Sequence, residues 1–145
     1  MTKGLALLAL VMLCTCPLTG CLGEPPSDFH YTVEDAEGEA SSLSSEDALF
    51  TITLSDRGEV NMKFSSLSIT VKQDGTAYQC LAEGEGGNCT VSQPSGSDDT
   101  LWEENETLVV SESGTDICGR TCIITFTVQG PEGSQTTGPT ILTIS

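Results

Sequence analysis

The fold is decided most clearly by residues 67–81, which read LSITVKQDGTAYQCL. Apolar residues alternate with polar ones as far as Val71, and this period of two is typical of a strand with one buried face. Asp74-Gly75 is the strongest hairpin signal in the chain, because both residue types accept the positive φ of a two-residue turn. Residues 76–81 alternate again. The stretch therefore predicts an antiparallel β-hairpin.

The same alternation recurs through the rest of the chain, between clusters of turn-forming residues. The other segments expected to form strands are 48–54, 89–92, 107–111, 122–128 and 140–144. Alternation at Val60, Met62 and Phe64 leads, after a register shift at Ser65-Ser66, into the first strand of the hairpin. About seven short strands, with no helix longer than one turn, predict an all-β domain. We expect an antiparallel immunoglobulin-like β-sandwich over residues 48–145. Alternation at Phe29, Tyr31 and Val33 makes residues 29–47 a candidate first strand followed by an acidic loop.

A short apolar segment lies at the N-terminus. Residues 5–18 are nearly all apolar or small and follow Lys3, which is the pattern of a secretory signal peptide and too short to span a bilayer. The end of this segment, Leu18-Thr19-Gly20-Cys21, resembles the lipobox of prokaryotic lipoproteins, archaeal ones included. The resemblance implies removal of residues 1–20, a diacylglycerol lipid on Cys21, a tether over 21–28 and anchoring on the outer side of a membrane. The alternatives are cleavage without lipidation and an uncleaved anchor.

Four cysteines remain in the β-region: Cys80, Cys89, Cys118 and Cys122. An even number of cysteines in an exported chain indicates disulfides. Three pairings are open, and we expect Cys80–Cys89 and Cys118–Cys122, because each closes a loop of turn-forming residues. The first link should stabilise the domain by roughly 2–3 kcal/mol. The alternative is a four-thiolate zinc site, but the spacings do not match a zinc ribbon or knuckle.

The mature chain is strongly acidic. All 21 acidic residues follow Cys21, and the basic residues that oppose them are Arg57, Lys63, Lys72 and Arg120. This balance argues against nucleic acid as a partner, since nucleic-acid binding needs a basic footprint. It also argues against adsorption of the domain on anionic headgroups. Membrane contact is thus expected through the lipid anchor, and the expected partner is a surface protein or a glycan.

Three stretches, residues 66–71, 98–108 and 111–114, resemble the β-sandwich head domain of archaeal pilins and archaellins. In that family an acidic Leu-Trp-Glu stretch followed by Glu-Thr begins a strand, as at residues 101–107 here. The resemblance implies a pilin-like surface protein. Family members polymerise through a long apolar N-terminal helix that the mature protein keeps. Here the apolar segment ends at the lipobox and is expected to be removed, which argues against assembly by that route.

Five carboxylates crowd one loop: Asp98, Asp99, Glu103, Glu104 and Glu106. Hard cations take several oxygens from a flexible loop, so these residues are a candidate Ca²⁺ site. Their spacing does not follow the EF-hand pattern, and the alternative is a solvated acidic loop. No other cofactor is indicated besides the covalent lipid.

Other single residues are weaker signals. Trp102, the only tryptophan, is expected to fill the end of the core rather than to stack on a ligand. Asn105 and Asn88 each begin an N-glycosylation triplet, and Asn105 is the better candidate because Asn88 adjoins a cysteine expected to form a disulfide.

Catalytic motifs are absent from the sequence. His30 is the only histidine, so a nucleophile–base pair would have a single base available. We therefore expect no enzyme. The leading expectation is a lipid-anchored cell-surface protein whose β-domain serves binding or structural contact. The alternative is a structural or accessory subunit of a pilus- or archaellum-like surface filament.

Overall fold

The computed structural model describes residues 28–82, 85–94, 100–131 and 134–145; the expected signal peptide and Cys21 lie outside them. In this part of the chain the structure has nine strands and one short 3-10 helix. They are β1 (Asp28–Asp35), β2 (Ala48–Asp56), η1 (Phe64–Ser66), β3 (Ser68–Gln73), β4 (Thr76–Ala82), β5 (Cys89–Ser92), β6 (Thr107–Glu112), β7 (Cys122–Gln129), β8 (Gln135–Thr137) and β9 (Ile141–Ile144). The prediction of an all-β chain is confirmed. None of the described helical segments has the length and apolarity to cross a membrane.

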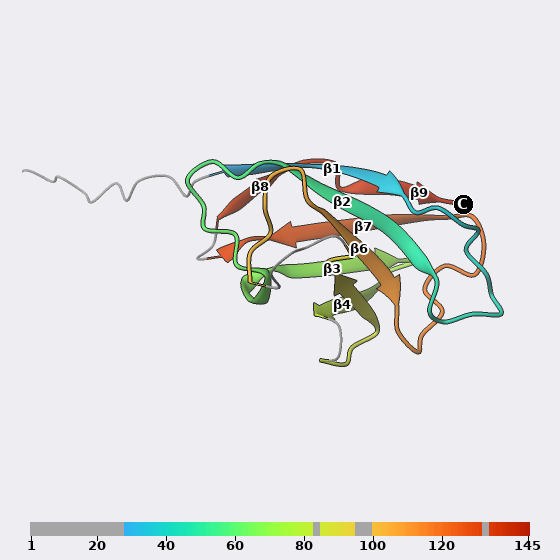
Figure 1. The fold of residues 1–145 in the computed structure, drawn as a ribbon. Coiled ribbons are helices and arrows are strands. Elements are labelled where there is room, and N and C mark those ends of the chain that lie inside the picture. Colours follow the sequence, from blue (N-terminus) through green and yellow to red (C-terminus); the bar gives the residue numbers. More distant parts are fainter. Residues whose placement is uncertain (1–27, 83–84, 95–99, 132–133) are drawn as a thin grey trace, which may run out of the picture.

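All nine strands belong to one sheet, in the order β8-β1-β2-β6-β5-β4-β3-β7-β9 (Figure 1). The predicted hairpin is present as β3 and β4, and its turn residues Asp74 and Gly75 have φ values of 47° and 84°. Two pairs, β1 with β8 and β4 with β5, are parallel. The prediction of a purely antiparallel arrangement is therefore wrong. The immunoglobulin-like sandwich is not confirmed either, because the described strands form one mixed sheet that nearly closes on itself.

The parallel pair β4–β5 depends on a very short return of the chain. Parallel neighbours ordinarily need a connection of about a dozen residues or more, but only residues 83–88 separate these strands. Gly86 and Gly87 have φ values of 83° and 110°, a region that other residues rarely adopt. A Cβ on Gly87 would lie 3.2 Å from the carbonyl oxygen of Gln79, so the loop turns back tightly against β4. The Cys80–Cys89 disulfide joins directly paired residues of the two strands.

The C-terminal segment nearly closes the sheet by changing partners. β8 pairs with β1, and after a three-residue break β9 pairs with β7, so β8 and β9 are the two terminal strands of the sheet order. The break packs on Tyr31, whose hydroxyl donates to the carbonyl of Pro139 at 2.9 Å. A Cβ on Gly138 would lie 2.6 Å from the Tyr31 ring, so only glycine permits this approach. This change of partner is why the number of strands exceeds the predicted seven and why one pair is parallel.

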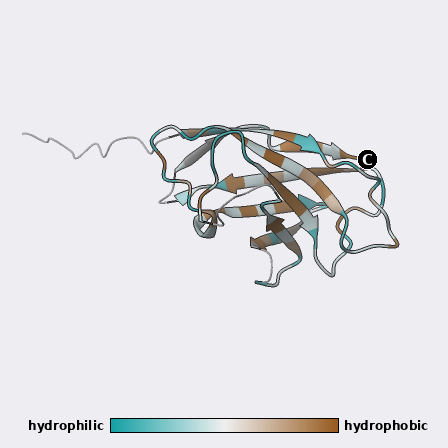
Figure 2. Ribbon diagram, in the orientation of Figure 1, coloured by the Kyte–Doolittle hydropathy of each residue, from teal (hydrophilic) through white to brown (hydrophobic). Residues whose placement is uncertain are grey.

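The core follows from the two-residue period of the strands. In β2, Phe50, Ile52 and Leu54 are fully buried, and the intervening residues are half-buried. Figure 2 shows hydrophobic residues alternating with more hydrophilic ones along several strands, as the burial pattern of β7 also does. Trp102 is 1% exposed, packs edge-on against Phe29 with ring centroids 6.3 Å apart, and donates from Nε1 to a backbone carbonyl. The expectation that Trp102 fills the core is confirmed.

The strand register gives the domain two distinct ends. β1 begins and β2 ends at the same end of the domain, where His30 pairs with Asp56. The segments 57–67 and 100–106 lie at this end as well. We call it the entry end. Segments 36–47 and 113–121 and the last residue of the chain gather at the opposite end, which we call the far end (Figure 1).

Candidate functional site

The acidic loop at the entry end is closed by its own side chains. The carboxylate of Glu106 accepts hydrogen bonds from the backbone N–H of Glu103 at 2.8 Å and from the side-chain amide of Gln93 at 3.1 Å. The carbonyl of Glu106 accepts from the Trp102 indole at 2.9 Å. Glu106 thus serves to hold the loop over the core, a role that its place in an acidic run did not indicate.

The calcium prediction remains a prediction. Asp98 and Asp99 lie outside the described residues, and Glu103 and Glu104 are exposed on the loop. Within the residues that are described, no three His, Cys, Asp or Glu side chains gather in a way that could hold a metal ion. The described part of the loop therefore shows a hydrogen-bonded turn.

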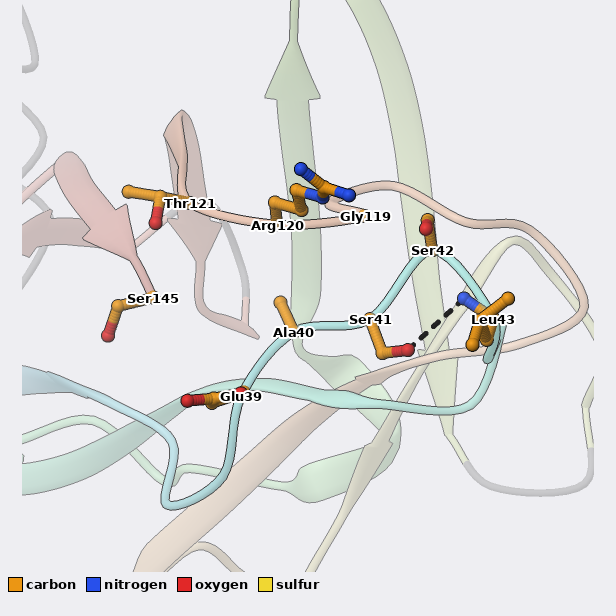
Figure 3. A pocket seen from close by; sticks show the side chains of 9 residues that line it. All are labelled: Glu39, Ala40, Ser41, Ser42, Leu43, Gly119, Arg120, Thr121 and Ser145. Carbon is orange, nitrogen blue, oxygen red and sulfur yellow. Dashed lines mark hydrogen bonds between the residues drawn. The ribbon is translucent and has the colours of Figure 1, made fainter.

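A groove of about 630 Å³ with a mixed polar and apolar lining lies at the far end (Figure 3). Two segments far apart in sequence form its walls. One wall carries Ser41, Ser42 and Leu43, and the other carries Arg120 and Thr121. The two segments meet where a Cβ on Gly119 would lie 2.8 Å from the Cβ of Ser42, so a glycine is required for their close packing. The lining of the groove therefore includes one guanidinium group and several hydroxyls.

The wall that carries Arg120 is fixed in two ways. The Cys118–Cys122 disulfide closes a five-residue loop around it. Behind this loop, Oε1 of Glu112 accepts hydrogen bonds from the backbone N–H groups of Ile117 and Cys118, at 2.7 and 2.8 Å. Glu112 is 2% exposed, and Oε2 of the same carboxyl has no partner among the described residues.

Burial raises the pKa of Glu112, because removal from water disfavours the charged carboxylate. The two backbone hydrogen bonds oppose this effect, and the nearby charges of Asp116 and Asp47 add to the rise. Sequence reasoning missed Glu112. The signal was its place two residues after Val110 and four after Leu108, on the inward face of β6. A buried carboxylate on that face needs hydrogen-bond donors, and here the backbone supplies them.

The remaining candidate residues lie apart from the groove or at its margin. Both predicted disulfides form with the local pairing. Asn105 is exposed in a turn with φ 67°, and Asn88 is exposed with its amide donating to the Thr115 hydroxyl at 3.0 Å. Both glycosylation sites remain predictions. His30 is exposed on β1.

Comparisons with known proteins give little further information. No family model matches the chain. No curated protein matches it either. Among solved structures, the chain is similar to the archaellum periplasmic stator protein FlaG from Sulfolobus acidocaldarius, with a TM-score of 0.47 and 10% identity, over 80% of this chain and 99% of that one. This degree of similarity assigns neither a fold nor a function.

Proposed function

We propose that the chain is an exported lipoprotein, held on the outer side of a membrane by a diacylglycerol on Cys21. Its β-domain acts without catalysis, by binding a surface protein or a glycan. The observation that carries the proposal is the lipobox-like sequence Leu18-Thr19-Gly20-Cys21 directly after an apolar segment. Two acyl chains suffice for stable attachment, because each buried methylene contributes about 0.8 kcal/mol.

The structure of the domain supports export. Two disulfides indicate an oxidising compartment, since thiols in the cytosol are kept reduced. β1 begins seven residues after Cys21, and an extended chain of that length spans at most about 25 Å. The entry end would therefore lie close to the membrane, and the groove at the far end would be presented outward.

The direct test is replacement of the expected lipid-bearing cysteine. Cys21→Ser should move the protein from the membrane fraction to the soluble exported fraction. Cys14→Ser is the matched control, because Cys14 lies in the segment that is expected to be removed, and it should leave the protein on the membrane. A Cys21→Ser protein that stays with the membrane after a carbonate wash contradicts the proposal.

The alternative is an accessory subunit of a surface filament, and one observation favours it. Ile123 on β7 and Ile141 on β9 are 66% and 63% exposed, and the two strands are adjacent. The other outward-facing residues of these strands include threonines, and none of them is acidic. Like-charged subunits could meet there with little repulsion. Under this alternative Ile141→Glu abolishes co-purification with filaments. If the protein never co-purifies with a filament, the alternative is wrong.

A further inference from the structure

We propose that the far-end groove binds an acidic saccharide, with Arg120 receiving the carboxylate or sulfate group of the sugar. The proposal rests on the proposed function, because a domain exposed on the cell surface is the one that would encounter such a saccharide. The groove itself can be tested on the purified chain.

The guanidinium of Arg120 is available to a ligand. The mature chain has 21 acidic residues, yet within the described residues no carboxylate forms an ion pair with Arg120. The other three basic residues lie elsewhere, with Arg57 and Lys63 at the entry end and Lys72 on β3. A guanidinium presents a planar fork of donors that matches a carboxylate or a sulfate. Arg120 is therefore the natural contact for one anionic group at the far end.

The support behind Arg120 is more rigid than an exposed loop requires. The Cys118–Cys122 link and the two hydrogen bonds to buried Glu112 hold the backbone on both sides of Gly119. Burying a carboxyl with one oxygen unpartnered costs stability. A rigid mounting reduces the ordering cost of binding.

The opposite wall selects for a sugar. Ser41 lines the groove, and its hydroxyl oxygen accepts the backbone N–H of Leu43 at 3.1 Å (Figure 3). Ser42 and Thr121 add further hydroxyls, and the side chain of Leu43, 98% exposed, offers an apolar surface at the rim. Paired hydroxyls and a small apolar contact suit a sugar ring. An acidic peptide offers few hydroxyls to this wall.

Glu39 also lines the groove and limits the charge that it accepts. A second anionic group beside the first would meet this carboxylate, so the site favours one anionic group per bound unit. Removal of the Glu39 charge should therefore strengthen binding, whereas removal of the Arg120 charge should weaken it.

The experiment is calorimetric titration of the mature, lipidated chain in detergent micelles at low salt. The ligands are a tetrasaccharide that contains glucuronate, its analogue with glucose in place of glucuronate, and tetraglutamate. The glucuronate ligand should bind at least about tenfold more tightly than the other two. Arg120→Gln should weaken its binding about 10- to 100-fold, the range expected for loss of one charge-assisted hydrogen-bonded pair. Glu39→Gln should strengthen it.

Arg57→Gln is the matched control, because it removes the same charge at the entry end, and it should leave the affinity within about twofold. Each variant should keep its two disulfides and its thermal transition. The proposal is overturned if the glucuronate ligand does not bind, if Arg120→Gln and Arg57→Gln have equal effects, or if the neutral sugar or tetraglutamate binds as tightly. These outcomes leave the Cys21→Ser fractionation unaffected, so failure of this proposal and failure of the proposed function are distinguishable.

Discussion

Replacement of Glu112 tests how the far end is held together. Its Oε1 accepts two backbone N–H groups, from Ile117 and Cys118, which are 3% and 1% exposed. Glu112→Ala leaves both donors buried without an acceptor, at about 1–3 kcal/mol each. The two losses share one loop and are not fully additive, so the expected drop in the free energy of unfolding is about 2–5 kcal/mol.

The charge of Glu112 has a separate effect that depends on pH. Because its pKa is raised in the folded state, the folded protein binds more protons than the unfolded chain once the pH exceeds the unfolded pKa. Below that pKa the carboxyl is protonated in both states and the penalty is absent. As the pH rises toward the folded pKa, wild-type stability should fall relative to Glu112→Gln, by at most about 1.4 kcal/mol per pH unit. Above the folded pKa the difference should stay constant.

The assay is urea unfolding with the disulfides intact, followed by the fluorescence of buried Trp102, from about pH 4 to about pH 8. Glu112→Gln keeps an acceptor at Oε1, so the difference between this variant and wild type isolates the charge. A loss below about 1 kcal/mol in Glu112→Ala would refute the structural role. A wild-type protein that gains stability relative to Glu112→Gln as the pH rises would refute the assigned direction of the pKa.

Three further predictions concern the sheet and its surface. Gly138→Ala should lower stability by about 1–3 kcal/mol because its Cβ meets the Tyr31 ring, and by less in a Tyr31→Ala background, as a double-mutant cycle measured by urea unfolding would show. The double variant Cys80→Ala and Cys89→Ala should lower stability by about 2–3 kcal/mol, and an unchanged urea midpoint would contradict the role of the link between β4 and β5. In a host that glycosylates, Asn105→Gln should remove one glycan from the intact mass, whereas an equal mass would show that Asn105 is unused.

The sequence predicts much of the sheet because local patterns carry it. The hairpin around Asp74-Gly75 has a specific turn chemistry, and strands such as β2 and β7 have clear two-residue alternation. The pairing of the cysteines follows because each pair closes a short loop. These features depend on neighbours in the chain, which a single sequence records.

The features that were missed depend on long-range contacts. β8 reads Gln-Thr-Thr, which has no apolar alternation, and it forms because β1 offers a free edge. Val60 and Met62 alternate like a strand and are buried, but the chain there is irregular and leads into η1. The parallel direction of β5 depends on the tight return at Gly86 and Gly87, which the glycine-rich composition indicated only as a loop.

The far-end groove was missed for the same reason. Its walls lie near residues 41 and 120, about eighty positions apart in the sequence, and no short motif connects them. Arg120 was noted only as one of four basic residues, and Glu112 lay one residue beyond the strand expected over 107–111. The inward position of Glu112 was a usable signal, since a carboxyl on the buried face of a strand requires donors from elsewhere in the fold.

Lipid anchoring is tested most directly by the mass of the N-terminal peptide from protein purified out of its own membrane. We expect a mature chain that begins at Cys21 and carries a diacylglycerol on its sulfur. A mature chain that begins at another residue, or an unmodified Cys21 in membrane-bound protein, would contradict this expectation.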